Sequence, residues 1–542
     1  MRFFLPLRRM LSSYAMGLFK EGVHRKIFFA SLALSLASLP FSEYALSIGV
    51  ISLSVNWILE GGIKRKVKML AKRRSALLFM LIYFSLLVGM FYTSNFAYGL
   101  SELRLKLPLL FLPLVLATST PVNGRELFYL LTIFVISVLV ASFYSSFLFF
   151  QTFYFGGANV REISPFVSHI RFGLMVNIAF FICVFYLVKP PLFMKGMARS
   201  VFIVVLAWLL FFILILQSLT AVVVLVSTVL FLLFLSVFFV QNIVGRFAIF
   251  VFLCCSVLFV ASFTAHQVDA YFTRQPFDES DLELETKNGN VYFHDPQKIQ
   301  YENGYPVWIN ISWSELSNEW NRISNIPFSG KDRLGQPLNA TLIRYLSSMG
   351  LTKDSVGISK LDKVDVGLIE SGVTSIIFKQ HRFGLYPRMY QFFWEIDQYL
   401  NVGQVNGSPF VQRFIYIKSA IALISEYFWF GVGTGDLADS FTEYYRLNEP
   451  NLHKPFWYLS HNQYLTQWVA LGFFGFVFFL TGWFIPFFQE KRHTDFLAIT
   501  FFFIITLSMF NEDTFQTHVG VCLASIFYSI AVFSKESNES IL

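Results

Sequence analysis

Residues capable of chemistry gather late in the chain, between positions 431 and 475. This stretch opens with three alternating glycines and an aspartate, Gly431-Val432-Gly433-Thr434-Gly435-Asp436. His461 and Asn462 follow, directly before a long apolar run. Histidine titrates near neutral pH and is the usual general base in enzymes. We therefore interpret His461 as a candidate catalytic base, the alternative being an interfacial histidine that only forms hydrogen bonds.

Four glycines accompany the His-Asn pair. Gly433 and Gly435 permit tight turns and close approach of two backbones, although the same run also suits a plain turn at the end of a helix. Gly472 and Gly475 lie inside the apolar run, and we expect them on one helix, where small residues allow close packing. Asn462 and these four glycines are predicted to support the site rather than to react.

Two arginines offer positive charge at the same face of the predicted fold. Arg171 opens an apolar run over 169–188, and Arg413 opens a second run over 413–430. Arginine stays charged and can donate two hydrogen bonds to one phosphate group. Helix N-termini add partial positive charge at this face. Both arginines are candidate diphosphate ligands; the alternatives are a snorkelling arginine that anchors a span and an ordinary exposed arginine.

Weaker candidates lie near these residues. Arg382 and Arg388 fall in the same polar part of the chain as Arg413. Glu512, Asp513 and Gln516 separate two late apolar runs. These three residues either steer a substrate, buffer protons or simply keep a loop hydrated.

Several motifs that carry chemistry are absent from the sequence. It contains no GxxxxGK[ST] phosphate loop, no GxGxxG after a strand, no HExxH and no CxxC. We therefore expect neither a metal nor another cofactor. Energy for any reaction must then come from the substrate or from an ion gradient.

The composition is that of a membrane protein. The 542 residues are 55% hydrophobic and only 14% charged, whereas soluble domains carry about 25% charged residues. The mean hydropathy is +0.57, and several apolar runs reach the roughly 20 residues that cross a bilayer. The net charge of +8 comes from basic residues between apolar runs, which the positive-inside rule explains without nucleic acid. We predict an all-α polytopic membrane protein with about 12 transmembrane helices.

Apolar length and the placement of Lys and Arg locate the spans. The predicted spans are about 27–42, 44–59, 76–93, 106–119, 126–150, 169–188, 201–217, 219–240, 247–265, 464–487, 496–511 and 517–533. Residues 413–430 are nearly long enough to be a further span. A crossing there would place the charged residues 490–492 outside, so we predict a periplasmic or interfacial helix instead.

The spans divide the chain into five segments. Residues 266–460 are polar and too long for a loop without structure of its own, so we expect a folded periplasmic domain. The predicted segments are a cytoplasmic or interfacial 1–26, spans one to nine over 27–265, a periplasmic loop domain with the candidate motif over 266–463, spans ten to twelve over 464–533, and a cytoplasmic tail over 534–542.

This combination resembles the O-antigen ligase and polymerase family of membrane glycosyl transferases. The resemblance rests on the pair that begins at His461, on the Gly-x-x-Gly that begins at Gly472, and on a large loop late in a chain of many spans. It covers most of residues 75–530 and is strongest at 408–475. Residues 330–354 look like a branch of the family with an enlarged loop.

The resemblance implies an enzyme of the bacterial inner membrane with its active site on the periplasmic side. The donor would be a glycan on undecaprenyl diphosphate, and a ligase would transfer it to a sugar hydroxyl of the lipid A core. By resemblance, His461 activates that hydroxyl while Arg171 and Arg413 hold the diphosphate. The alternatives are a polymerase that joins lipid-linked repeats, a transferase to protein hydroxyls, a transporter of lipid-linked glycans and a membrane scaffold.

Overall fold

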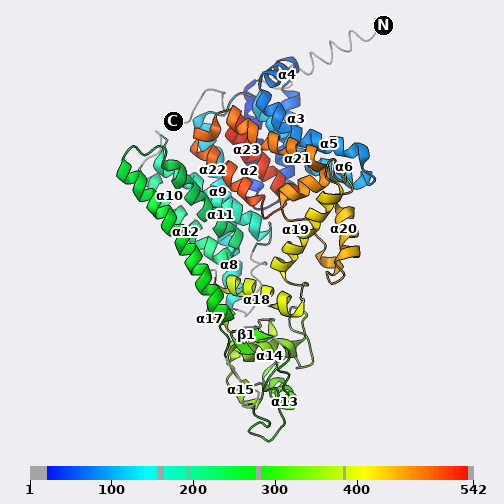
Figure 1. Ribbon diagram of the computed structural model, residues 1–542. Coiled ribbons are helices and arrows are strands. Elements are labelled where there is room, and N and C mark those ends of the chain that lie inside the picture. Colours follow the sequence, from blue (N-terminus) through cyan, green and yellow to red (C-terminus); the bar gives the residue numbers. More distant parts are fainter. Residues whose placement is uncertain are drawn as a thin grey trace.

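Helices make up most of the chain in the computed structural model (Figure 1). The structure describes residues 21–154, 164–191, 196–275, 282–298, 300–381 and 386–534. Within these ranges the strands are the short β1 (Tyr301–Glu302) and β2 (Tyr305–Pro306), which pair antiparallel. The predicted all-α class is therefore confirmed.

Helices that are mostly apolar, together with one short basic helix over 63–72, build a bundle that holds most of the predicted spans. They are α2 (Glu21–Ser38), α3 (Glu43–Leu59), α4 (Ile63–Lys72), α5 (Arg74–Gly89), α6 (Phe96–Leu105), α7 (Pro108–Thr118), α8 (Gly124–Tyr154), α9 (His169–Val188), α10 (Gly196–Leu216), α11 (Leu219–Ser236), α12 (Ile243–Phe272), α21 (Gln463–Gln489), α22 (Phe496–Ser508) and α23 (His518–Phe533). Several start at a polar side chain that accepts a backbone N–H of the first turn, as Ser168 does for α9 and Thr517 for α23. Such caps satisfy donors that hydrocarbon would leave unpaired.

The number of membrane crossings is only partly decided by these helices. Within the described ranges seven helices are long and apolar enough to cross a membrane, or up to eight if the bent pair α3–α4 forms one span. Helices occupy the other predicted spans, but α7, α22 and α23 have only 11, 13 and 16 residues. The total of twelve spans and the sidedness of the bundle stay predictions. Residues 1–20 of the predicted N-terminal segment and 535–542 of the tail lie outside the described ranges.

Helix α21 packs along α5. An aromatic cluster fills the space between them, with the ring of Phe79 in α5 6.0 Å from Trp483 in α21 and 4.4 Å from Tyr528 in α23. All three side chains are buried. Because aromatic rings bury large areas, this cluster holds the C-terminal part of α21 firmly against its neighbours.

A second, smaller core lies at the far end of the molecule from α4 (Figure 1). It is formed by α13 (Trp313–Ile323), α14 (Leu338–Ser348), α15 (Ser355–Ser359), α16 (Lys363–Glu370) and α17 (Ile377–Gln380). Trp320 and Tyr345 are fully buried at its centre. Residues 330–354 belong to this core, where the Asp332 carboxylate accepts a hydrogen bond from the Thr341 hydroxyl at 2.7 Å. The enlarged loop is thus a folded unit rather than an irregular connection.

Three helices connect this small domain to α21. They are α18 (Tyr386–Val402), α19 (Pro409–Glu426) and α20 (Leu437–Asn448). Helix α19 contains most of the predicted helix 413–430 and is not among the seven spanning candidates. It packs against α18, α20 and α21, so its first turn lies close to the start of α21.

Candidate active site

His461 lies in the turn directly before α21. Its φ is 51°, a left-handed conformation that few residues other than glycine adopt. Its backbone N–H donates to Oδ2 of Asp513 at 2.8 Å. Tyr416 and Tyr458 flank the imidazole, with ring centroids 5.6 and 5.9 Å away. The backbone and two aromatic rings therefore hold the imidazole, and the only hydrogen bond recorded for His461 among the described residues uses its backbone.

The loop between α22 and α23 is fastened to the start of α21. Oδ1 of Asp513 accepts the Thr466 hydroxyl at 2.6 Å. Oε1 of Gln463 accepts the backbone N–H of Phe515 at 2.7 Å, and the backbone N–H of Gln463 donates to the carbonyl of Met509 at 2.8 Å. These hydrogen bonds make the loop and the first turn of α21 one rigid unit.

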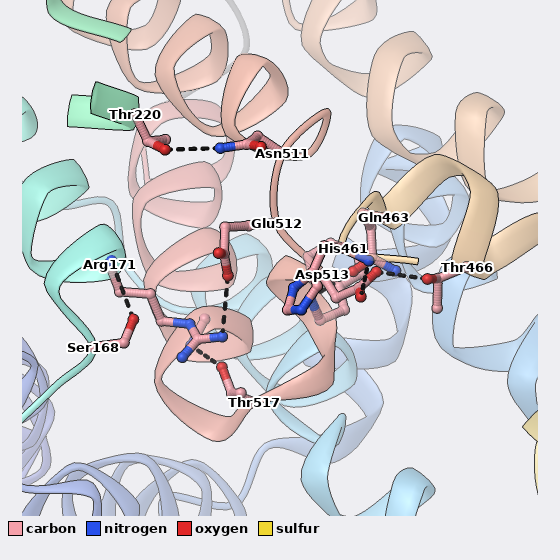
Figure 2. Close-up of polar contacts among 12 residues, drawn as sticks. Ser168, Arg171, Thr220, His461, Gln463, Thr466, Asn511, Glu512, Asp513 and Thr517 are labelled. Carbon is pink, nitrogen blue, oxygen red and sulfur yellow. Dashed lines mark hydrogen bonds and ion pairs between the residues drawn. The ribbon is translucent and has the colours of Figure 1, made fainter. Parts of the chain in front are cut away.

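Glu512 brings the two arginines together. The guanidinium of Arg171, in the first turn of α9, lies 3.5 Å from the Glu512 carboxylate, and that of Arg413, near the start of α19, lies 3.8 Å from it. Figure 2 shows Glu512 directed at Arg171, while the adjacent Asp513 lies beside His461. The structure thus gathers the three residues singled out from the sequence around one acidic turn.

Burial and the positive neighbours set the protonation of this cluster. Burial, together with the charges of Arg413 and Arg171, lowers the pKa of His461 to about 4. Burial raises the pKa of Asp513 to about 6, and it raises the pKa of Glu512 against the opposing effect of the arginines. At neutral pH the imidazole is therefore neutral and able to accept a proton, next to two permanent positive charges.

A buried ion pair supports the acidic turn from the junction of α6 and α7. Lys106 and Glu102 form a salt bridge, and both side chains are almost fully buried. The side-chain amide of Gln516, four residues beyond Glu512, contacts both partners. The charge of Lys106 also acts on Asp513, where it lowers the pKa. The loop that the sequence allowed to be simply hydrated is instead packed between helices.

Helix α21 is broken at Gly472. This residue has φ 64° and ψ −169°, so the helix stops and restarts there. Gly472 and Gly475 both lie within α21, as expected, but the backbone of Gly472 is not helical. The break frees backbone groups, and the segment after α19 pairs with them: Val432 N–H donates to the Val469 carbonyl and Phe473 N–H donates to the Phe428 carbonyl, at 2.9 and 2.8 Å. Backbone groups at membrane depth need such partners.

The glycine run joins this break to the start of α6. Gly433 has φ 100°, and a Cβ on Gly435 would lie 2.2 Å from the Asn95 carbonyl oxygen. The Asp436 carboxylate accepts the backbone N–H groups of Ser94 and Asn95, both at 2.7 Å. The run is therefore a structural joint between α5, α6 and α21.

Alanine at the joint should destabilise the protein strongly. A Cβ on Gly431 would lie 2.4 Å from the backbone nitrogen of Gly472, and a Cβ on Gly472 would lie 2.3 Å from that of Phe430. An alanine held at a positive φ destabilises the folded protein by about 1–3 kcal/mol through backbone strain alone. We expect Gly431→Ala and Gly472→Ala each to lower the Tm of the detergent-solubilised protein by far more than Gly367→Ala, whose Cβ meets open space on a helix. An unchanged Tm for Gly472→Ala would contradict the role of this segment as a structural joint.

A comparison with protein families matches the part of the chain that contains His461 and Arg413. Residues 371–480 match the family model described as O-antigen ligase. This part of the chain is therefore similar to the O-antigen ligase family. Members of this family are membrane enzymes of the glycosyl transferase kind, ligases or polymerases. No curated protein matches the chain.

The O-antigen ligase match runs from the end of the small domain to the middle of α21. It includes Arg413, the glycine run and His461. Arg171 and Glu512 lie outside the matched residues, yet the fold brings both against them. The site is therefore assembled from the matched residues, from the first turn of α9 and from the loop between α22 and α23.

The remaining predicted residues have different places. Asn462 caps α21, because its side-chain oxygen accepts the backbone N–H groups of Tyr464 and Leu465 at 3.0 and 3.1 Å. Arg388 lies on α18 and donates to Gln391 at 3.0 Å, and Arg382 lies outside the described residues. Among the described residues no group of three or more His, Cys, Asp or Glu side chains is arranged to hold a metal ion.

The sequence predicts several roles for Glu512 and Asp513 without choosing among them, although the candidate site is arranged around this pair. Both are 6% exposed. The sequence does contain one signal for this pair, which is that two acidic residues stand in a short connection between two apolar helices. Ionisable residues close to membrane-embedded segments are rare and usually have a functional role. The sequence does not reveal their partners, because Arg171 lies 341 residues away from Glu512 and Arg413 about 100 residues away.

Proposed function

We propose that the protein is an O-antigen ligase-type glycosyl transferase. It takes a glycan from undecaprenyl diphosphate and transfers it to a sugar hydroxyl of the lipid A core at the periplasmic face of the inner membrane. The observation that supports this best is the meeting of a neutral histidine with two arginines around Glu512, beside and within the O-antigen ligase match.

The chemistry requires one base and a place for a diphosphate. The acceptor oxygen forms a bond to the anomeric carbon, while the bond from that carbon to the diphosphate oxygen breaks and its electron pair leaves with the diphosphate. His461 accepts the hydroxyl proton at its imidazole. Arg171 and Arg413 stabilise the negative charge that develops on the leaving group. Attack from the face opposite the diphosphate inverts the anomeric carbon and needs a single base.

Glu512 explains how two arginines stay close together before a donor binds. Their guanidinium groups repel each other, and the carboxylate between them offsets this repulsion. The contacts of 3.5 and 3.8 Å are longer than the usual 2.7–2.9 Å of charged hydrogen bonds. A diphosphate, which carries more charge and more acceptor oxygens, can therefore compete with Glu512 for both arginines.

Surface lipopolysaccharide from deletion cells tests the proposed function. A gel would compare cells without the gene, cells complemented with the wild type and cells complemented with a His461 variant. For a ligase, long glycans accumulate on the carrier lipid and fail to reach lipid A. If only single repeats appear on lipid A, the protein is the polymerase. An unchanged pattern rejects both reactions and leaves transfer to another acceptor, or transport, as the remaining readings.

A pH profile of transfer should show the effect of the two arginines on His461. The pKa of the free-enzyme imidazole, about 4, predicts that kcat/KM falls only as the pH drops towards that value, because protonation removes the base. A bound diphosphate offsets the arginine charges and should raise this pKa. We therefore expect the acid limb of kcat at higher pH than that of kcat/KM, since kcat reports the complex. Arg413→Gln should move the kcat/KM limb upwards; coincident limbs in both proteins contradict this account.

A further inference from the structure

Helix α4 leaves the direction of the bundle. It follows α3 after a short break and is bent by 110° from it. Figure 1 shows α4 at the end of the bundle opposite the small domain. Because α3 runs through the bundle, a helix at this angle lies roughly parallel to the membrane surface.

One side of α4 fixes its orientation on the bundle. Lys66 is buried, with its ammonium group 2.7 Å from the Glu60 carboxylate and 4.7 Å from the centre of the Trp57 ring. It also donates to the carbonyl of Trp57. These contacts prevent α4 from rolling, so the residues on its other sides keep their directions.

Two parallel stripes occupy the other sides. Ile63, Val67 and Ala71 recur every fourth residue and form an apolar stripe, in which Ile63 and Val67 are 48% and 58% exposed. The stripe shifted by one residue consists of Lys64, Lys68 and Lys72, all of which are exposed. Within the described part of the chain, no carboxylate lies within ion-pair distance of these three lysines.

We propose that α4 lies in the bilayer interface and that its lysine stripe binds anionic phospholipid headgroups. The apolar stripe would enter the boundary between headgroups and acyl chains, as in other amphipathic interfacial helices. The lysines would then lie at the level of the lipid phosphates, where clustered basic residues attract anionic lipids. The charge of the lysines, their exposure and the fixed orientation of α4 all favour anionic phospholipid headgroups as the ligand. This surface is far from the candidate active site, so the inference does not depend on the proposed function.

Thermal unfolding in mixed micelles tests the lysine stripe. The probe is phosphatidylglycerol added to detergent-solubilised protein, with zwitterionic phosphatidylcholine as the comparison lipid. We expect phosphatidylglycerol to raise the wild-type Tm more than phosphatidylcholine does, and high salt to remove the difference. Lys64→Gln/Lys68→Gln/Lys72→Gln should lose most of this rise. The charge-preserving triple arginine variant should retain it.

A second triple variant controls for the loss of charge. Lys287→Gln/Lys360→Gln/Lys363→Gln removes three exposed lysines from the small domain and should keep the full lipid response. An equal phosphatidylglycerol response in the α4 glutamine variant and the wild type overturns the proposal. So does an equal loss of the response in the small-domain variant.

A fluorescent probe tests the apolar stripe without removing any lysine. Ala71→Cys, in a background with Cys254 and Cys255 replaced, would carry an environment-sensitive dye in nanodiscs that contain phosphatidylglycerol. We expect blue-shifted emission and quenching by lipids brominated on the acyl chain. The same dye at Lys363→Cys, in the small domain, should show neither. Water-like emission at position 71 overturns the interfacial placement even if the glutamine variant fails to fold.

Discussion

His461→Asn is expected to lower glycosyl transfer by about 10²–10⁴-fold, the usual contribution of a general base. The imidazole is the neutral side chain beside the two arginines, and its pKa of about 4 keeps it unprotonated at neutral pH. The measurement is transfer of a lipid-linked glycan by purified protein in vitro, alongside the Tm of the same preparation. Wild-type rates from a folded variant would remove His461 from the mechanism.

Asparagine is a better replacement than alanine at this position. The φ of 51° is left-handed, a region in which asparagine is several-fold enriched over most residues. His461→Asn therefore keeps the backbone hydrogen bond to Asp513, whereas alanine adds strain and can lose activity by displacing the turn. His453→Asn, which changes an exposed histidine in the connection between α20 and α21, is the matched control and should keep full activity.

The sequence predicts the elements of this fold well because its strongest signals are local. Apolar length and basic flanks located each run, and the structure has a helix at each, as α9 at the predicted span 169–188 illustrates. Crossings are harder to count, because α22 and α23 are shorter than the membrane is thick. Hydropathy also does not predict the break of α21 at Gly472, because the partners of the backbone groups freed there come from the segment after α19.

The candidate site shows the same division between local and distant information. His461 was visible because histidine beside an apolar run is unusual, and Arg171 because arginine at the outer end of a span is unusual. The acidic pair that gathers them was not recognised, because its meaning depends on contacts across more than 300 residues, such as the pairing of Arg171 with Glu512. The sequence predicts only a supporting role for the glycine run, and the structure gives the run a specific role as a joint between α5, α6 and α21.

Arg171→Gln is expected to lower kcat by about 10²–10³-fold, comparable to the loss of one group that stabilises transition-state charge. The diphosphate gains negative charge as it leaves, so kcat should fall more than the donor KM rises. Arg171→Lys should recover only part of the rate, because an ammonium group lacks the two-pronged geometry of guanidinium. Arg446→Gln is the matched control, since among the described residues Arg446 pairs with Glu443 on the surface of α20, where such pairs contribute little.

A loss in Arg171→Gln alone has two explanations, and Glu512 separates them. The variant leaves the buried carboxylate with Arg413 as its remaining partner, and breaking a buried pair destabilises a protein by about 3–5 kcal/mol. Arg171→Gln/Glu512→Gln removes both charges, so it should regain the wild-type Tm. If Arg171 acts on the diphosphate, the double variant stays slow despite its restored stability. Recovery of activity together with stability would instead show that Arg171 only neutralises Glu512, and would leave Arg413 as the arginine available to the leaving group.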